Sequence, residues 1–184
     1  MSEASPDPVK DVQAKSKDFL EKAKSGNLDE GSLKWGLSAG AVVSGVSLFL
    51  NYFSFGEYGS ILGRSGISGW DLLSFRHGDS LDGLMALSIP LSALFGLYLH
   101  FGEPSLKLLK LETPGRAKTV YLIGAIVAAL GVVGCLRILS HQVCLGSVLG
   151  LVGLAVLAFV YFKLWKASPA ATSQPPLPPP SAGA

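Results

Sequence analysis

The two cysteines of this sequence are the first residues whose positions decide what chemistry they can do. Cys135 and Cys144 stand on either side of a short polar stretch. If that stretch is the tip of a helical hairpin, both thiols lie at similar depth below it, where a disulfide can form on an oxidising side of a membrane. The alternative is that both are small apolar residues in helix contacts. Redox catalysis is disfavoured, because the pair is not a C-x-x-C motif at a helix start.

His100 and His141 are candidate ligands for haem or another pigment. Each is expected at the end of a membrane-spanning helix, and the two ends lie on opposite sides of the bilayer. They therefore cannot be the two axial ligands of one haem, although a single histidine can still hold one pigment. The alternative is an interfacial histidine bonded to backbone or lipid headgroup. His77 and His141 alone do not make a metal site. We expect no metal and no cofactor.

Four apolar segments must position these residues. They cover approximately residues 33–55, 81–101, 119–139 and 143–165. A bilayer core of roughly 30 Å needs about 20 apolar residues in a helix. The chain is 49% hydrophobic and 15% charged, whereas a soluble domain carries about a quarter charged residues. The sequence therefore predicts an all-α membrane protein with four transmembrane helices.

The last two segments are separated by only four polar residues, Arg137, Ser140, His141 and Gln142. One helix from Thr119 to Trp165 would be about 70 Å long, more than twice the bilayer core. A tight helical hairpin is the better interpretation. Arg137 lies within one turn of its tip, so its charge can reach the interface by snorkelling.

Glycines three to seven residues apart recur along these segments and predict close helix packing. The candidate packing residues are Gly36, Gly40, Gly124, Gly131, Gly146 and Gly150.

The regions outside the spans are polar. Residues 1–32 are expected to be cytoplasmic and to hold one amphipathic helix, starting at Asp7-Pro8 and ending at Gly26, which lies on the membrane or on a partner. Residues 56–80 are rich in glycine and suit turns, a short hairpin or a segment that re-enters the interface. Residues 166–184 are rich in proline and are expected to be a disordered tail.

Lysine and arginine are distributed unevenly among these polar regions. The segment before the first span, the connector 102–118 and the start of the tail hold most of them, whereas the 56–80 loop holds Arg64 and Arg76. The positive-inside rule then places both termini in the cytoplasm. We expect a multi-pass protein of the bacterial inner membrane. The net charge of +2 is too small to indicate nucleic acid.

The segments Asn51-Tyr52-Phe53-Ser54-Phe55 and Gly66-Ile67-Ser68-Gly69-Trp70-Asp71-Leu72 carry a resemblance. An aromatic end to the first span, followed by a Ser-Gly-aromatic-Asp outer loop, resembles a group of small bacterial proteins with four membrane spans. The resemblance implies a four-helix inner-membrane architecture and implies no activity. The lysine-rich N-terminal segment and the proline-rich tail depart from that group.

No nucleophile and base can be paired in this sequence, and no P-loop or dinucleotide fingerprint occurs in it. We therefore expect a protein that is not an enzyme. The leading hypothesis is a subunit or scaffold of a membrane complex, whose partners are the lipid bilayer and other membrane subunits or further copies of itself. The alternatives are a small channel or transporter component and a pigment- or haem-binding subunit.

Overall fold

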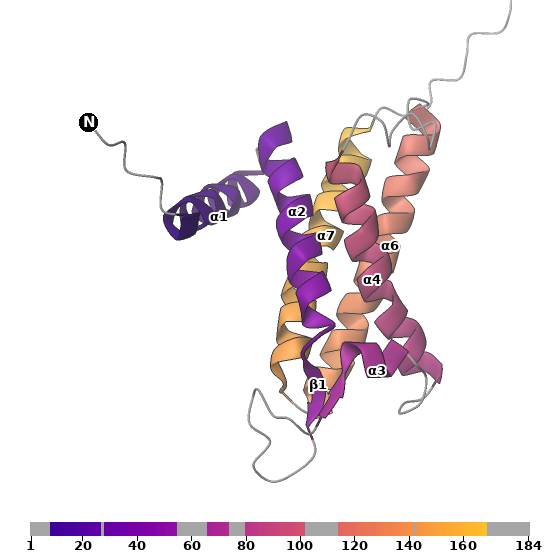
Figure 1. The fold of residues 1–184 in the computed structure, drawn as a ribbon. Helices are drawn as coiled ribbons and strands as arrows, with labels where there is room; N and C mark the ends of the chain where they lie inside the picture. Colours follow the sequence, from indigo (N-terminus) through magenta and orange to yellow (C-terminus); the bar gives the residue numbers. More distant parts are fainter. Residues whose placement is uncertain are drawn as a thin grey trace, which may run out of the picture.

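The computed structural model describes residues 8–26, 28–54, 66–73, 80–101, 114–141 and 143–168. It is mostly helical, and its four longest apolar segments lie side by side as a bundle (Figure 1). The elements are α1 (Pro8–Ser25), α2 (Glu30–Ser47), β1 (Asn51–Ser54), β2 (Gly66–Ser68), α3 (Gly69–Leu73), α4 (Ser80–His100), α6 (Pro114–His141) and α7 (Leu145–Ala167). The connector 102–113 and the tail from residue 169 lie outside the described residues.

Two of these helices are long and apolar enough to cross a bilayer. They cover Gly115–His141 and Leu145–Ala167, and Ala86–His100 is a shorter apolar helix. Helix α6 ends at His141 and α7 begins at Leu145, and the two helices pack along their lengths. The predicted helical hairpin is therefore confirmed, with α6 longer at both ends than the expected 119–139.

The first apolar segment differs from its prediction, because it is not one helix from 33 to 55. Helix α2 ends at Ser47, whose hydroxyl donates to the Ser44 carbonyl at 2.7 Å. The next three amides donate to carbonyls three residues earlier in the chain, as Leu50 N does to Ser47 O at 3.1 Å. The serine hydroxyls at this end compete for helix carbonyls, and glycine has a low helix propensity. The chain therefore leaves the helix here and forms β1.

Strand β1 pairs antiparallel with β2, so the hairpin expected within 56–80 begins earlier, at Asn51. Helix α3 follows β2 directly. Its start is a reciprocal cap in which Ser68 N and Ser68 Oγ donate to Asp71 Oδ2 at 2.9 and 2.7 Å, while Asp71 N donates to Ser68 Oγ at 3.3 Å. Trp70 in α3 packs edge-on against Phe49, with ring centroids 5.7 Å apart. These elements close the end of the bundle away from α1 (Figure 1).

The N-terminal helix follows its prediction closely. Helix α1 starts at Pro8 and ends at Ser25, before Gly26 with a φ of +76° that favours glycine. Asp7, its expected cap, lies outside the described residues. The helix lies across the bundle rather than along it (Figure 1).

Two apolar cores fill the bundle. One lies toward α1 and contains Phe19, Leu37, Leu157, Val160 and Tyr161. The other lies toward the β hairpin and contains Leu48, Tyr52, Ile89, Cys135 and Leu154. All six candidate packing glycines are buried, so the close helix packing is internal to the chain.

Candidate functional site

His100 ends α4 beside the start of α2. Its Nδ1 lies 3.0 Å from Ser38 Oγ and 3.2 Å from the Lys34 carbonyl. Ser38 Oγ in turn donates to the same carbonyl at 2.8 Å. Because a carbonyl only accepts, a proton on Nδ1 satisfies both contacts and leaves Nε2 as the nitrogen free to accept or to ligate.

His141 lies exposed at the end of α6, at the other end of the bundle from His100. The two histidines therefore do not share a site, as the sequence predicts. The described residues contain no group of three or more His, Cys, Asp or Glu side chains that could hold a metal ion. His77 lies outside those residues.

Cys135 and Cys144 are both buried, and no disulfide joins them. The structure therefore does not contain the disulfide that the hairpin topology allowed. Cys135 lies in the core toward the β hairpin, where a Cβ on Gly150 would approach its Sγ at 3.2 Å. Tyr52 fills the same core and exchanges a 2.9 Å hydrogen bond with Ser47 Oγ. Cys135 thus takes the packing role that was the alternative to a disulfide.

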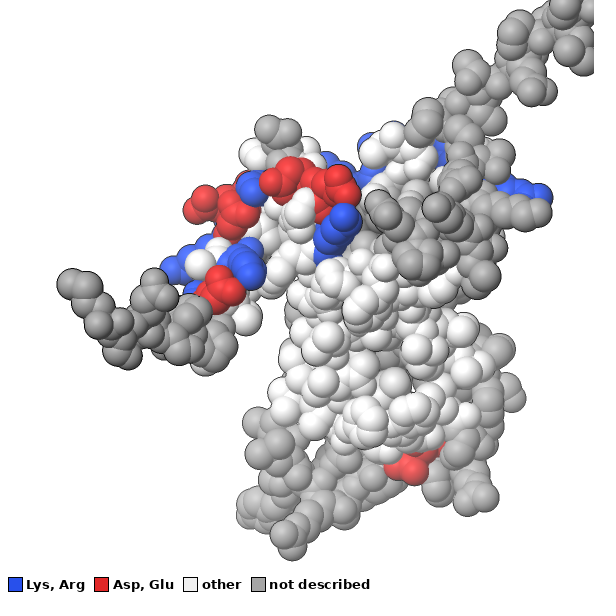
Figure 2. All heavy atoms as spheres, turned by 45° about the horizontal axis from the view of Figure 1, so that its top comes forward, with Lys and Arg blue, Asp and Glu red and all other residues white. Residues whose placement is uncertain are grey.

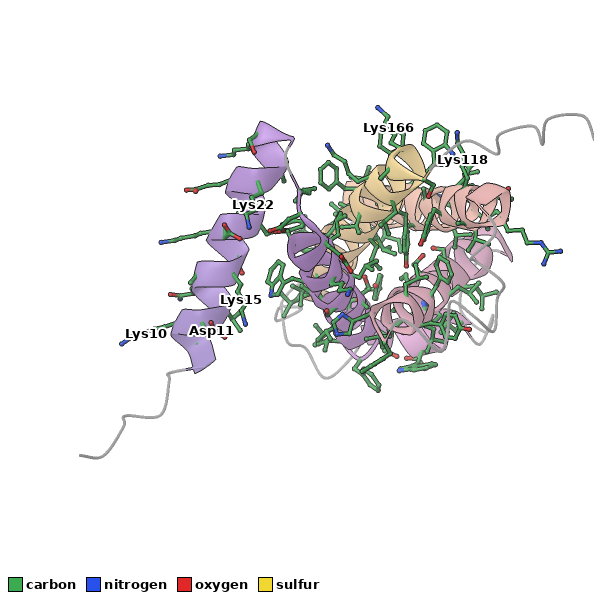
Figure 3. The ribbon with its side chains drawn as sticks, turned by 90° about the horizontal axis from the view of Figure 1, so that it is seen from above. Lys10, Asp11, Lys15, Lys22, Lys118 and Lys166 are labelled. Atoms are coloured by element: carbon green, nitrogen blue, oxygen red, sulfur yellow. The ribbon has the colours of Figure 1, made fainter. Side chains whose placement is uncertain are left out.

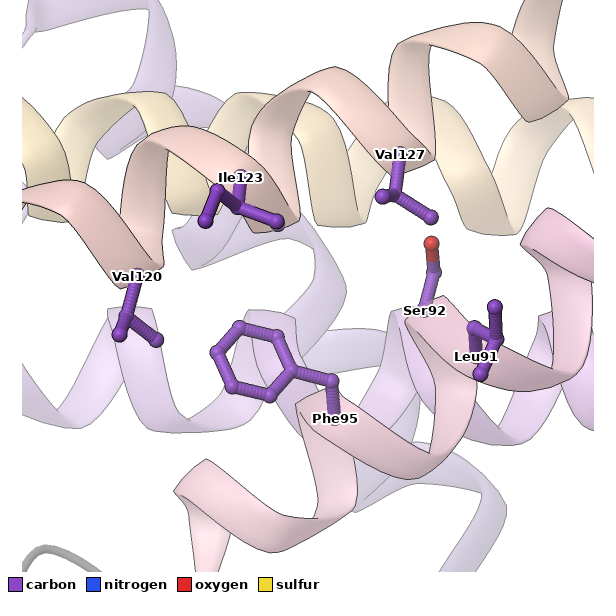
Figure 4. Close-up of a pocket in the computed structure, with 7 residues that line it drawn as sticks. Leu91, Ser92, Phe95, Val120, Ile123 and Val127 are labelled. Carbon is purple, nitrogen blue, oxygen red and sulfur yellow. The ribbon is translucent and has the colours of Figure 1, made fainter. Parts of the chain in front are cut away.

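An apolar groove lies between α4 and α6. Its volume is about 400 Å³, and it is lined by Leu91, Ser92, Phe95, Val120, Ile123, Gly124 and Val127. Figure 4 shows the Ser92 hydroxyl pointing from α4 toward Val127 on α6. Ser92 is 2% exposed, and its Oγ has no hydrogen-bond partner among the described residues. The surface of the groove is almost entirely apolar, and it suits an apolar ligand such as a lipid chain.

A second, polar cavity of about 440 Å³ lies where α1 meets the ends of α2 and α4. Charged residues from both α1 and α2 line it, together with Trp35, Ser38 and His100. Its charges are already paired: Lys22 Nζ lies 2.8 Å from Asp18 and 3.1 Å from Asp29, and Lys34 lies 2.8 Å from Glu30. Because these side chains are paired, little net charge remains to attract a free anion. The charged groups therefore contribute more to the contact between the helices than to the binding of a ligand.

Asp29 has two roles at this junction. It caps α2 by accepting from Ser32 N at 2.8 Å, and it accepts from Lys22 on α1. The hydrogen bonds from Ser32, followed by that from Lys22, lower the pKa of the Asp29 carboxyl from its ordinary value. Asp29 is therefore ionised throughout the neutral range and holds α1 to α2.

The sequence analysis did not single out Ser92, Asp29 or Tyr161. The spacing of serine within an apolar segment gives no sign of which hydroxyl faces a groove. The Asp29-x-x-Ser32 spacing before an apolar run was a signal for the cap of α2.

No protein-family model matches the chain, and no curated protein or solved structure matches it significantly. The resemblance suggested by residues 51–55 and 66–72 therefore stays a prediction.

Proposed function

We propose that this chain is a four-span protein of the bacterial inner membrane that serves as a non-enzymatic subunit or scaffold of a membrane complex. In this proposal α2, α4, α6 and α7 cross the bilayer together. The shorter α2 completes its crossing through the β hairpin and α3, whose aromatic pair Phe49–Trp70 suits an interface.

The observation that carries the proposal is the apolar exterior of the bundle. Large aliphatic side chains point outward along α6, with Ile126, Leu130 and Val133 each 52% exposed. Exposing such a surface to water costs free energy, whereas lipid chains can cover it without that cost. The apolar run of α7 from Leu145 to Phe162 extends about 27 Å, close to the bilayer core.

Most of the described charged residues lie at one end of this apolar surface, while Asp71 and Arg137 lie at the other. Figure 2 shows Lys, Arg, Asp and Glu side chains over α1 and the neighbouring helix ends, above a bundle that is mostly uncharged. Lys118 and Lys166 lie at that same end, seen from above in Figure 3. Lys118 Nζ is 5.6 Å from the centre of the Trp165 ring, a pair typical of the membrane interface. The positive-inside rule supports a cytoplasmic location for this end and for both flanking segments.

A scaffold role is favoured because the packing glycines of the bundle make their contacts within the chain. Gly40 faces Gly153 and Leu157, Gly131 faces Leu154, and Gly124 faces Phe95. The candidate glycines are therefore occupied within the chain, and partners must use the outer aliphatic faces or the charged end. Partner subunits and further copies of the chain both fit such faces.

Photo-cross-linking in native membranes tests the scaffold proposal. A photoreactive residue at Leu130, on the outer face of α6, should capture a discrete protein that co-purifies in mild detergent, whereas one at the buried Leu157 should capture none. A Leu130 cross-linker that reacts with lipid alone, together with a monomer that purifies without partners, contradicts the proposal.

Accessibility labelling tests the topology separately. Cysteines at Lys166 and Glu21 should react with an impermeant thiol reagent from the cytoplasmic side, and a cysteine at Trp70 from the outer side. Labelling of Trp70 and Lys166 positions from one side contradicts the four-span arrangement.

A pigment-binding role is the second candidate, and His100 carries it through its free Nε2. Visible absorbance in protein purified from its own membrane, lost in His100→Ala and kept in His141→Ala, would support this role. A colourless preparation would exclude it.

A further inference from the structure

Helix α1 has two chemically different sides. At about 100° per residue, its apolar residues fall on one side and its acidic residues on the other. The apolar side comprises Val9, Val12, Phe19, Leu20 and Ala23, and the opposite side carries Asp11, Asp18 and Glu21. Phe19 is buried, whereas the other large members of the apolar side are mostly exposed: Val9, Val12 and Leu20 are 62%, 57% and 57% exposed.

The lysines of α1 occupy the two edges between these sides. Lys15 and Lys22 lie along the edge next to Phe19, whereas the opposite edge carries Lys10, Lys17 and Lys24 at seven-residue spacing. Figure 3 shows Lys10 pointing away from the bundle and Lys15 pointing toward it. This arrangement lets each lysine lay its methylene chain along the apolar side and hold its ammonium group at the boundary with water.

Contacts with α2 fix the position of α1. The Phe19 ring packs on Trp35 with centroids 5.4 Å apart, and its Cε2 would lie 2.9 Å from a Cβ on Gly36. Lys22 reaches Asp29 at 3.1 Å on the other side of the turn at Gly26. The helix is therefore attached at the charged end of the bundle, at the level of the interfacial Trp35, with its axis across the bundle (Figure 1).

We propose that α1 lies in the surface of the bilayer, with its apolar side among the lipid chains and its edge lysines on anionic phospholipid headgroups. This inference rests on the proposed membrane location of the bundle. Lipid is favoured over a partner protein because α1 adjoins the lipid-facing wall of the bundle, and because lysines at the edges with acids opposite match the depth gradient of a membrane surface.

Spin-label accessibility in the full chain tests the inference. Single cysteines would replace Val12 and Leu20 on the apolar side, Asp18 on the acidic side, and Leu130 in the middle of α6. The protein would be placed in vesicles of phosphatidylcholine with or without phosphatidylglycerol, and the unsubstituted chain would report background labelling of its buried thiols.

We expect labels at Val12 and Leu20 to collide more with oxygen than with a water-soluble nickel complex, and a label at Asp18 to show the reverse. The Leu130 label separates the two hypotheses. A water-exposed Leu130 label overturns the membrane location itself. A lipid-exposed Leu130 label with a water-exposed Val12 label overturns only the inference about α1, as does a Val12 label shielded from both reagents by protein.

A matched pair of variants tests the role of the anionic headgroups. Lys17→Gln with Lys24→Gln removes two edge lysines, and Asp11→Asn with Glu21→Gln removes two charges from the opposite side. With phosphatidylglycerol present, the lysine variant should reduce the depth of the Val12 label in the bilayer, and the acidic-side variant should not. A Val12 label at the same depth in both variants, and at the same depth with and without phosphatidylglycerol, would overturn the assignment to anionic lipid.

Discussion

The hydroxyl of Tyr161 on α7 donates a 2.8 Å hydrogen bond to the backbone carbonyl of Ser92 on α4. Tyr161 is fully buried, and its ring also packs on Phe95 with centroids 5.3 Å apart. One side chain thus fixes the contact between two helices that are distant in the sequence. It also lies directly behind the groove that Ser92 and Phe95 help to line.

Tyr161→Phe removes this hydrogen bond and keeps the ring. Because the Ser92 carbonyl can still accept its helical bond, the loss should be modest, about 1 kcal/mol of unfolding free energy. Circular dichroism during titration of mixed micelles with SDS measures it. Tyr121→Phe is the control, since Tyr121 is only partly buried and should change the midpoint much less. Equal shifts in the two variants would contradict the assigned role of Tyr161.

Gly153→Ala should destabilise the contact between α2 and α7. An added Cβ would lie 2.7 Å from Ser44 N and 2.9 Å from Gly40 O, both backbone atoms that cannot move without the helix. We expect a loss of about 1–3 kcal/mol in the same titration, as for overpacked cores. Gly45→Ala is the matched control, because nothing lies within 4 Å of a Cβ there, and it should be neutral or slightly stabilising. A harmless Gly153→Ala would show that α2 and α7 are not in close contact.

The sequence predicted those parts of this fold that depend on local pattern. Long apolar runs indicated α4, α6 and α7, and the polar residues before Val143 indicated the hairpin turn. The end of α2 could not be placed, because Asn51–Ser54 is apolar enough to continue a helix and becomes a strand only through pairing with Gly66–Ser68. The partners of Tyr161 and His100 were equally hidden, since Ser92 and Ser38 lie 69 and 62 residues away from them in the chain.

The junction between α1 and α2 should weaken in acid. Hydrogen bonds from Ser32 and Lys22 lower the pKa of Asp29 in the folded protein. A lowered pKa means that the stabilisation is complete at neutral pH, begins to fall near the ordinary pKa of an aspartate, and is lost as the pH drops through the lowered value. Distances between spin labels at Lys17 and at an outer position of α6 should broaden over that acid range.

Two substitutions separate the roles of Asp29 at neutral pH. Asp29→Asn keeps a side chain that caps α2 and removes the charge facing Lys22, whereas Asp29→Ala removes both. The first should broaden the label distance alone, and the second should also lower the stability of α2. Asp11→Asn, which breaks only an exposed pair with Lys15, is the control. A label distance unchanged by pH and by both Asp29 variants would show that the ion pair does not hold α1.

The two thiols should stay reduced and unreactive in the folded protein. Cys135 and Cys144 are 2% and 6% exposed, and thiol reagents act on exposed thiolate. A water-soluble maleimide should therefore label neither cysteine in mild detergent and both after denaturation in SDS. Cys135→Ser should be tolerated better than Cys135→Val, because the Tyr52 and Ser47 hydroxyls lie beside the thiol and can accept or donate a hydrogen bond, whereas a larger side chain would overpack against Gly150. An intact mass lower by two hydrogens, restored by a reductant, would show that the hairpin carries the disulfide instead.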